Sequence, residues 1–222
     1  MATRVGMITI GQSPRPDVVP EIVATVGRPM AVVEAGALDG LDHAAVRGLT
    51  PRPGDETLVT RMADATEVHV AKREIIPRLQ SCIRRLSRDV DMIVVLCTGI
   101  FPEFHAPVPL LEPQRLLDRI VESVAGRGGH IGVMVPAAAQ AEASRRKMEE
   151  YGLTATVAVA SPYGRLDEIR RAGESFRDAD VKAVVMHCIG YDAKMKTDVR
   201  QQCGKPVLLA RSLVGKILEE ML

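Results

Sequence analysis

Short apolar runs alternate with longer amphipathic stretches along the chain. Five runs are continuously apolar rather than alternating, and they are rich in Val, Ile and Leu, which predicts strands buried on both faces. They fall at residues 5–10, 91–96, 131–135, 181–186 and 207–209. Apolar positions spaced by three and four, which predict helices, occupy residues 74–86, 137–151 and 213–222. Strands that alternate with helices predict an α/β protein with parallel sheets and right-handed crossovers.

The two halves of the chain contain three similar segments in the same order. The paired segments are residues 5–8 with 131–134, 91–99 with 181–190, and 107–117 with 206–214. Similarity between single strand–helix units is common, so the shared order is the stronger evidence. We therefore predict two pseudo-symmetric parallel-sheet lobes related by duplication.

The repeat also sets the expected lobe boundaries. We expect an N-terminal lobe of residues 1–108, completed by residues 206–222, and a C-terminal lobe of residues 109–205. Gly6 and Cys97 are 91 positions apart, whereas Gly132 and Cys188 are 56 apart. The 35 extra residues of the first half are expected within residues 35–70, as a turn-rich insertion with a short strand pair. Such insertions often form lids or subunit contacts.

Composition excludes several classes of function. The chain is 46% hydrophobic and 26% charged, which is typical of a globular protein, and its formal net charge is +1. With 3% aromatic residues and no Trp, it lacks the basic excess and the stacking platforms that nucleic-acid binding requires. No apolar run reaches the roughly 18–20 residues that cross a bilayer, and the first residues lead directly into a strand pattern. We therefore expect a cytoplasmic protein that contacts neither nucleic acid nor membrane; a homo-oligomer is left open.

The cysteines are the strongest chemical signal. Four widely spaced cysteines without a CxxC pair, and histidines without metal-ligand spacing, predict reduced thiols and no metal site. Cys97 and Cys188 each end a Val-rich repeat and are each followed two positions later by Gly. The carboxyl ends of parallel strands are the usual ligand site, and backbone N–H groups of the next turn favour a thiolate there. A single cysteine in such a place is more often an inert core residue; a matched pair favours function.

Other candidates surround the two cysteines. In the loop after the first strand, Arg15 is a natural partner for a carboxylate, although this segment also suits a simple helix start. Cys82 and Cys203 fit core positions, and His187 is expected to point away from Cys188 as a hydrogen-bonded packing residue. The candidate substrate-binding residues are Gln12, Ser13, Arg15, Thr98, Gly99, Ile189, Gly190 and Tyr191.

Residues 8–17 (Ile-Thr-Ile-Gly-Gln-Ser-Pro-Arg-Pro-Asp), with the segments 96–99 and 187–191, resemble the AroM family. That family is a branch of the aspartate/glutamate racemase superfamily, which includes hydantoin racemases, maleate isomerases and arylmalonate decarboxylases. The resemblance covers nearly the whole chain. It implies a two-lobed α/β fold with the active site in the cleft between the lobes.

The sequence departs from the better-characterised racemases at both cysteines. Those enzymes typically follow the first Cys with Asn-Thr and the second with Thr-His, whereas here Thr98-Gly99 and Ile189-Gly190 follow. Specificity for aspartate or glutamate is therefore not expected. The substrate is expected to be another small carboxylate or a cyclic imide-like compound.

Two thiols on opposite sides of a cleft suit proton transfer at a carbon acid. One thiolate removes a proton from a carbon beside a carboxylate, and the opposite thiol returns a proton to the planar intermediate. This chemistry requires no metal or other cofactor, so we predict a cofactor-independent racemase or isomerase with Cys97 and Cys188 as the acid/base pair. Two alternatives remain open: a decarboxylase or other lyase on the same scaffold, and a non-catalytic regulatory protein that binds a small acid.

Overall fold

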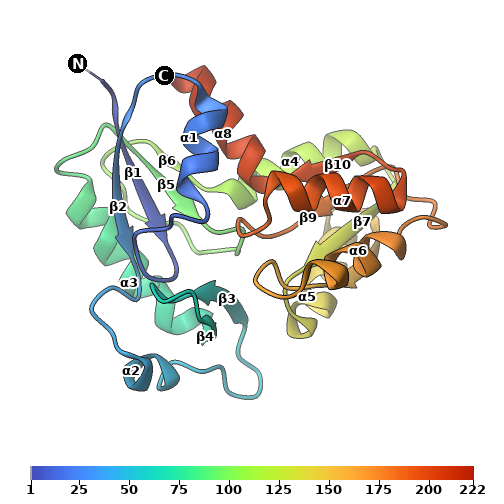
Figure 1. Cartoon of the computed structure of the whole chain (residues 1–222), viewed down its shortest axis with the longest axis horizontal. Helices are drawn as coiled ribbons and strands as arrows, with labels where there is room; N and C mark the ends of the chain where they lie inside the picture. The colour runs from blue at the N-terminus through green and yellow to red at the C-terminus, as the bar shows by residue number, and fades with distance from the viewer. Residues whose placement is uncertain (1) are drawn as a thin grey trace. The chain divides into compact units, whose positions relative to one another are not determined.

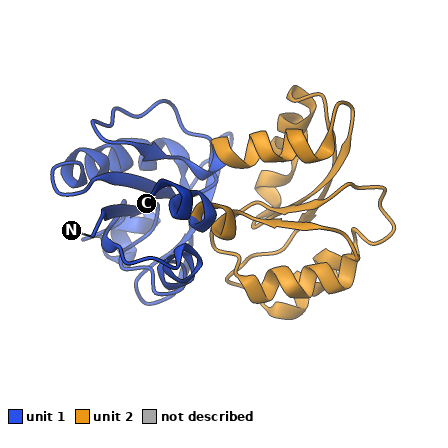
Figure 2. Ribbon diagram, turned by 90° about the horizontal axis from the view of Figure 1, so that it is seen from above, with its two compact units in different colours: residues 1–114, 215–222 blue, residues 115–214 orange. Residues whose placement is uncertain are grey.

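The protein, described here for residues 2–222 by a computed structural model, divides into two compact units. Unit 1 comprises residues 1–114 and 215–222, and unit 2 comprises residues 115–214 (Figure 2). Each unit is an α/β structure with a four-stranded parallel sheet (Figure 1). The predicted fold class, two parallel-sheet lobes, is confirmed.

Unit 1 contains the first nine elements of the chain. They are β1 (Arg4–Thr9), α1 (Val19–Val26), β2 (Ala31–Gly36), α2 (His43–Arg47), β3 (Thr57–Arg61), β4 (Glu67–Ala71), α3 (Lys72–Leu86), β5 (Met92–Leu96) and β6 (Leu110–Leu111). The sheet order is β2-β1-β5-β6, and all pairings in this sheet are parallel. Strands β3 and β4 form a separate antiparallel hairpin, so the predicted strand pair within residues 35–70 is confirmed.

Unit 2 repeats the strand order of unit 1. Its sheet is ordered β10-β9-β7-β8. In both units the first strand along the chain is central, the second is the edge strand beside it, and the third and fourth lie on its other side. The elements from residue 113 onward are α4 (Pro113–Ala125), β7 (His130–Val135), η1 (Ala138–Gln140), α5 (Ala141–Glu150), β8 (Thr154–Val159), α6 (Leu166–Glu174), β9 (Val184–Met186), α7 (Ala193–Cys203), β10 (Val207–Leu209) and α8 (Ala210–Met221).

The last strand lies in the second sheet. Because β10 pairs in parallel with β9, it belongs to unit 2, whereas the sequence analysis groups residues 206–214 with the N-terminal lobe. After β10 the chain returns to unit 1 at Gly215, within α8. The reason for a small residue at this position is close packing on α1: a Cβ on Gly215 would lie 2.6 Å from the Cβ of Thr25.

The five apolar runs are all strands, and the runs that the sequence analysis missed are edge strands. β5 is buried at every position and β1 at all but its first, as expected for strands covered on both faces. Most positions of β2 and β8 are exposed or only partly buried, so helices and loops cover these two strands less fully than β1 and β5. Their weaker apolar signal explains why the periodicity did not detect them.

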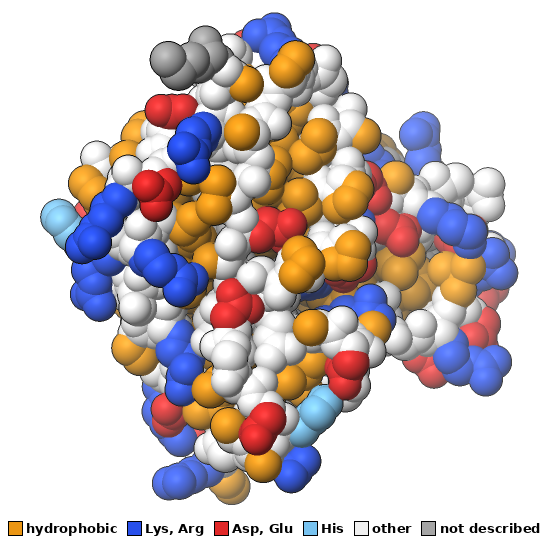
Figure 3. Space-filling view, turned by 60° about the vertical axis from the view of Figure 1, so that its left-hand side comes forward, with side chains coloured by type: hydrophobic (Ala, Val, Ile, Leu, Met, Phe, Trp, Pro, Cys, Tyr) orange, Lys and Arg blue, Asp and Glu red, His pale blue; other side chains and the backbone are white. Residues whose placement is uncertain are grey.

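Surface composition agrees with the near-zero net charge. On the face drawn in Figure 3, Lys and Arg side chains are interspersed with Asp and Glu rather than gathered into one basic area. No helix within residues 2–222 is long and apolar enough to cross a membrane.

Candidate functional site

Cys97 begins the turn that follows β5. β5 pairs with β1 so that Leu96 lies beside Thr9, which brings the Cys97 turn next to the loop that follows β1. The Cys97 side chain is 9% exposed, and its Sγ accepts a hydrogen bond from the Gly99 backbone N–H at 3.2 Å. The thiol thus lies at the carboxyl edge of the first sheet, as predicted.

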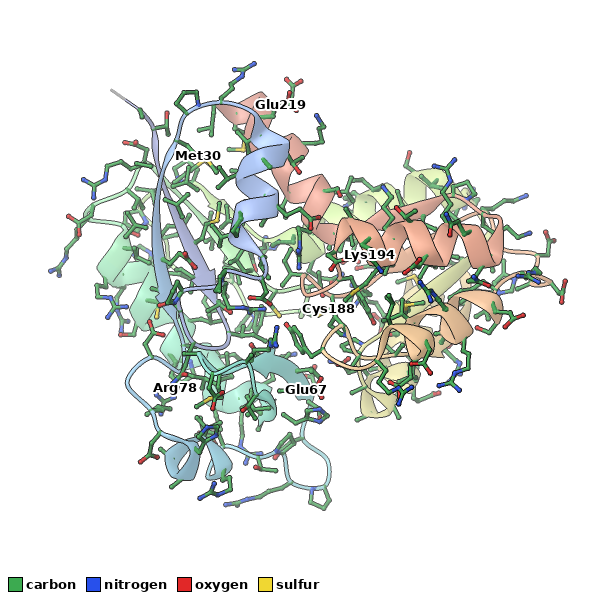
Figure 4. All side chains as sticks on the ribbon, viewed as in Figure 1. Met30, Glu67, Arg78, Cys188, Lys194 and Glu219 are labelled. Carbon is green, nitrogen blue, oxygen red and sulfur yellow. The ribbon has the colours of Figure 1, made fainter. Side chains whose placement is uncertain are left out.

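Cys188 holds the matching place in unit 2. It follows β9 by two residues (labelled in Figure 4), is 8% exposed, and its Sγ accepts a hydrogen bond from the Gly190 N–H at 3.4 Å. Each sulfur is therefore bonded to the N–H of the glycine two positions later. A hydrogen bond of this kind favours the charged form of its acceptor, so both turns support a thiolate.

Close packing explains the two glycines. A Cβ on Gly99 would lie 3.2 Å from Leu58 Cδ2 and from Phe101 Cζ. A Cβ on Gly190 would lie 2.7 Å from Tyr163 Oη and 2.8 Å from Pro162 Cγ. A side chain at position 190 would therefore require Tyr163 or Pro162 to shift, whereas at position 99 the neighbouring side chains would have to move only slightly.

The buried side chain of Arg211 is hydrogen-bonded to the Cys188 turn. The sequence analysis did not identify this residue. Its side chain is 2% exposed, Nε donates to the Ile189 carbonyl at 3.1 Å, and Nη2 donates to the Gly190 carbonyl at 2.9 Å. In this turn the Gly190 N–H therefore donates to the Cys188 sulfur, and the carbonyls of Ile189 and Gly190 accept from the buried Arg211 guanidinium. The Arg in the third pair of repeated segments was a signal for this residue, but its burial depends on the tertiary fold.

The Gln12 side chain holds three segments of unit 1 together. Its amide nitrogen donates to the carbonyls of Leu38 at 3.2 Å and Leu41 at 2.7 Å, and its Oε1 accepts from the Ala63 N–H at 2.8 Å. Gln12 thus connects the β1 loop to the segment after β2 and to the turn of the hairpin.

Ser13 is bonded to a carboxylate of the protein itself. Its N–H and its hydroxyl both donate to Asp39, at 2.7 Å each, and the Gly36 N–H also donates to Asp39 at 2.7 Å. Asp39 therefore occupies the donors that the sequence analysis assigned to a substrate acid.

Arg15 is almost completely buried and is also engaged within unit 1. Its Nε and Nη2 donate to the two carboxylate oxygens of Asp17 at 2.8 Å, and Nη1 donates to Thr9 Oγ1 at 2.9 Å. Burial raises the pKa of Asp17, but the bidentate bond from Arg15 outweighs it, so the pKa lies below its ordinary value. Arg61 of β3 approaches the same carboxylate at 3.8 Å.

The remaining predicted residues differ in their surroundings. Thr98, 5% exposed, is the one hydroxyl side chain of the Cys97 turn, and Ile189 is 3% exposed. Tyr191 is fully buried and donates its hydroxyl to the Ala160 carbonyl at 2.6 Å, so it anchors the turn to the segment after β8. The structure thus groups Thr98 and Gly99 with Cys97, and Ile189, Gly190 and Tyr191 with Cys188.

The other two cysteines lie in structural positions, as predicted. Cys82 is buried on α3, where burial raises the pKa of its thiol. Cys203 closes α7, ahead of Gly204, whose φ of 67° ends the helix. Cys82 Sγ donates to the carbonyl of Gly36, the last residue of β2, at 3.6 Å, whereas Cys203 lies at the end of a helix that precedes β10.

His187 is a buried packing residue, as expected, and one of its ring nitrogens, the buried Nε2, is without a hydrogen bond among the described residues. Burial, followed by the nearby ammonium of Lys147, lowers the pKa of His187 to about 3. Lys147 itself forms a buried ion pair with Asp118 at 2.5 Å, and a backbone hydrogen bond to the His187 ring offsets only part of the lowering.

Two matched units, each with a parallel sheet and a cysteine turn at its carboxyl edge, define the class: a two-unit α/β fold that solved structures of a glutamate racemase and a maleate isomerase share. The chain belongs to the AroM family, because the family model described as "AroM protein" matches residues 5–222. No curated protein matches the sequence.

Solved structures of the same fold carry several activities. The glutamate racemase from Aquifex pyrophilus is 17% identical (99% of this chain, 84% of that chain, TM-score 0.59). The maleate isomerase Iso from Pseudomonas putida S16 is 16% identical (100% and 93%, TM-score 0.64). An arylmalonate decarboxylase is 15% identical (99% and 91%, TM-score 0.58). At these identities the likeness shows the fold alone.

Proposed function

We propose that this protein catalyses cofactor-independent racemisation or isomerisation of a small carboxylate-bearing or cyclic imide-like compound. The observation that carries the proposal is the matched pair of turns, in which Cys97 Sγ and Cys188 Sγ each accept a glycine N–H. A thiol with a backbone donor at the same place in both units fits a reaction that moves protons on two faces of one carbon. Solved structures of this fold that are named as racemases and an isomerase support the reaction type.

In the proposed reaction, one thiolate takes the proton of the carbon next to the carboxylate, and the electron pair is delocalised onto the carboxylate. The second thiol gives its proton to the opposite face of that carbon, which leaves the second cysteine as thiolate and the first as thiol. The reverse turnover restores the starting state. The reaction therefore requires both sulfurs to reach one substrate carbon.

We assign substrate-carboxylate binding to the Cys97 turn rather than to Arg15. The Arg15 guanidinium is paired with Asp17 and the Ser13 hydroxyl with Asp39, so displacing either would leave a protein carboxylate with fewer bonds. Thr98 lies next to Cys97 and offers a hydroxyl and an N–H. Donors of this kind stabilise the charge that develops as the proton leaves.

The test is a screen of small acids and cyclic imides for hydrogen–deuterium exchange in heavy water, followed by single variants on the substrate found. We expect Cys97→Ser and Cys188→Ser each to abolish net racemisation, because a hydroxyl is a far poorer base than a thiolate. Each variant should retain exchange on one enantiomer through its surviving thiol, and the two should favour opposite enantiomers. Cys82→Ser and Cys203→Ser are the matched controls and should remain near the wild-type rate.

Three results contradict the proposal. One is wild-type racemisation by either single variant. A second is release of carbon dioxide without racemisation, which would assign the site to a lyase. The third is calorimetric binding of an acid that shows no exchange with any form of the protein, which would assign the site to a regulatory binder.

A further inference from the structure

The hairpin of β3 and β4 has no counterpart in unit 2, where the described chain passes from β8 directly to α6. The hairpin is attached to the loop after β1. The Gln12 N–H donates to the Arg61 carbonyl at 3.1 Å, and a Cβ on Gly11 would lie 2.3 Å from the Arg61 carbonyl oxygen and 2.4 Å from Thr60 Oγ1. The inserted segment is therefore docked at the carboxyl edge of the first sheet.

One side chain of this hairpin reaches the Cys97 turn. Leu58 is two positions before Thr60 and thus lies on the same face of β3; it is 5% exposed. Its Cδ2 is 3.2 Å from the place that a Cβ on Gly99 would occupy. Leu58, Phe101 and Cys97 belong to the same apolar cluster, so Leu58 and Phe101 pack against the glycine whose N–H donates to the Cys97 sulfur.

This contact lies beside the hydrogen bond that the Cys97 sulfur accepts from Gly99. Apolar surroundings disfavour a thiolate, whereas a backbone N–H aimed at the sulfur favours it. The Gly99 N–H supplies that bond at 3.2 Å, and its strength depends steeply on distance and angle. A residue that prevents Gly99 from moving therefore controls the balance between the thiol and the thiolate.

We propose that Leu58 is a positioning residue for Cys97: the inserted hairpin uses it to keep the Gly99 N–H on the Cys97 sulfur. The inserted hairpin then contributes to the surroundings of the Cys97 thiol. The inference concerns a thiol on which the proposed function rests, but its test requires no substrate.

The experiment measures the alkylation of Cys97 and Cys188 by iodoacetamide as a function of pH, with both peptides quantified by mass spectrometry in one sample. The pH midpoint reports the thiol–thiolate balance, and the plateau rate at high pH reports accessibility. In Leu58→Ala we expect the Cys97 midpoint to move to higher pH, so that its rate at pH 7 relative to its own plateau falls about threefold to tenfold. The Cys188 midpoint should remain unchanged and serves as the internal reference.

Val59→Ala is the matched control, because Val59 is as buried as Leu58 but points to the other face of β3. Leu58→Met should keep the wild-type midpoint because it retains the volume of the side chain. If Leu58→Ala does not fold, Leu58→Val tests the same contact with a smaller loss. An unchanged Cys97 midpoint in Leu58→Ala or Leu58→Val, or an equal shift in Val59→Ala, overturns the proposal. A shifted midpoint without any exchange activity would contradict the proposed function and leave this inference standing.

Discussion

The Cys97 turn of unit 1 and the Cys188 turn of unit 2 have the same local geometry but different supports. The Cys97 turn is held mainly by apolar packing, from Leu58 and Phe101. The Cys188 turn has its carbonyls bonded to the buried Arg211 and its glycine against Pro162 and Tyr163. The difference shows that a duplicated strand order preserves the position of a reactive thiol while its surroundings diverge.

The loops after the first strand of each unit diverge in the same way. In unit 1 the loop after β1 carries Gln12, Ser13 and Arg15, each bonded to other parts of the unit. In unit 2 the loop after β7 reads Val-Pro-Ala-Ala-Ala at residues 135–139 and offers backbone groups only. The polar side chains of the β1 loop are therefore used within unit 1, and unit 2 has no matching network at residues 135–139.

The largest effect is expected at Arg211. Arg211→Met removes a buried cation and leaves the carbonyls of Ile189 and Gly190 without their donors, which should lower the free energy of unfolding by about 3 kcal/mol. Urea denaturation measures it. Arg127→Ala, an exposed arginine in unit 2, should change the free energy by less than about 0.5 kcal/mol. A loss at Arg211 no larger than at Arg127 would mean that the Cys188 turn is held by packing, as in unit 1.

The two glycines should respond unequally to alanine. Gly190→Ala places a methyl within 2.8 Å of Pro162 Cγ, whereas Gly99→Ala meets its nearest atoms only at 3.2 Å. We expect losses of unfolding free energy of about 2 kcal/mol for Gly190→Ala and about 1 kcal/mol or less for Gly99→Ala. Thermal and urea unfolding of the two variants in parallel measure both losses. Equal losses would show that the shorter distances around Gly190 have no effect on stability.

Lowering the pH should decrease the free energy of unfolding because His187 is buried in its neutral form. Its pKa is about 3 in the folded protein and near 6.5 when unfolded, so the unfolded chain binds the additional proton. Stability contributed by the neutral ring is complete above about pH 6.5 and declines as pH falls toward 3. Between pH 7.5 and 5 we expect this group to account for about 1–2 kcal/mol of lost unfolding free energy.

Variants isolate that contribution. His187→Asn should flatten the decline of unfolding free energy between pH 7.5 and 5, since the titrating group is absent. His105→Asn, at an exposed position of unit 1, should keep the wild-type slope. Identical slopes for wild type and His187→Asn would show that the ring is not held neutral in the folded protein.

The smallest effect is expected in the loop after β2. Asp39→Ala removes the acceptor for the Ser13 N–H, the Ser13 hydroxyl and the Gly36 N–H. Because Asp39 is exposed, water replaces part of these bonds, and we expect a loss of about 1 kcal/mol in urea unfolding. Asp89→Ala, also exposed in unit 1, is the control and should be near wild type. Equal free energies of unfolding for Asp39→Ala and Asp89→Ala would show that the hydrogen bonds of Asp39 do not stabilise unit 1.

The amino-acid sequence by itself determined the layout of the protein. Continuous apolar runs located the buried central strands, because burial on both faces requires apolar side chains at every position. The repeated order of segments predicted two similar sheets, and the placement of Cys97 and Cys188 after β5 and β9 followed from it. The edge strands β2 and β8 lacked that signal because most of their side chains are exposed or only partly buried.

Only the tertiary structure decided which side chains are committed within the protein. Arg15 pairs with its sequence neighbour Asp17, and folding buries Arg15 beside Thr9. Gln12 and Ser13 are suitable donors by residue type, but their partners Leu41 and Asp39 come from the segment after β2 that folding brings to the β1 loop. The contacts of Leu58 with Gly99 and of Arg211 with Ile189 likewise join residues 41 and 22 positions apart. Local periodicity reports burial, whereas hydrogen bonds and packing across such separations depend on how the strands and loops meet in space.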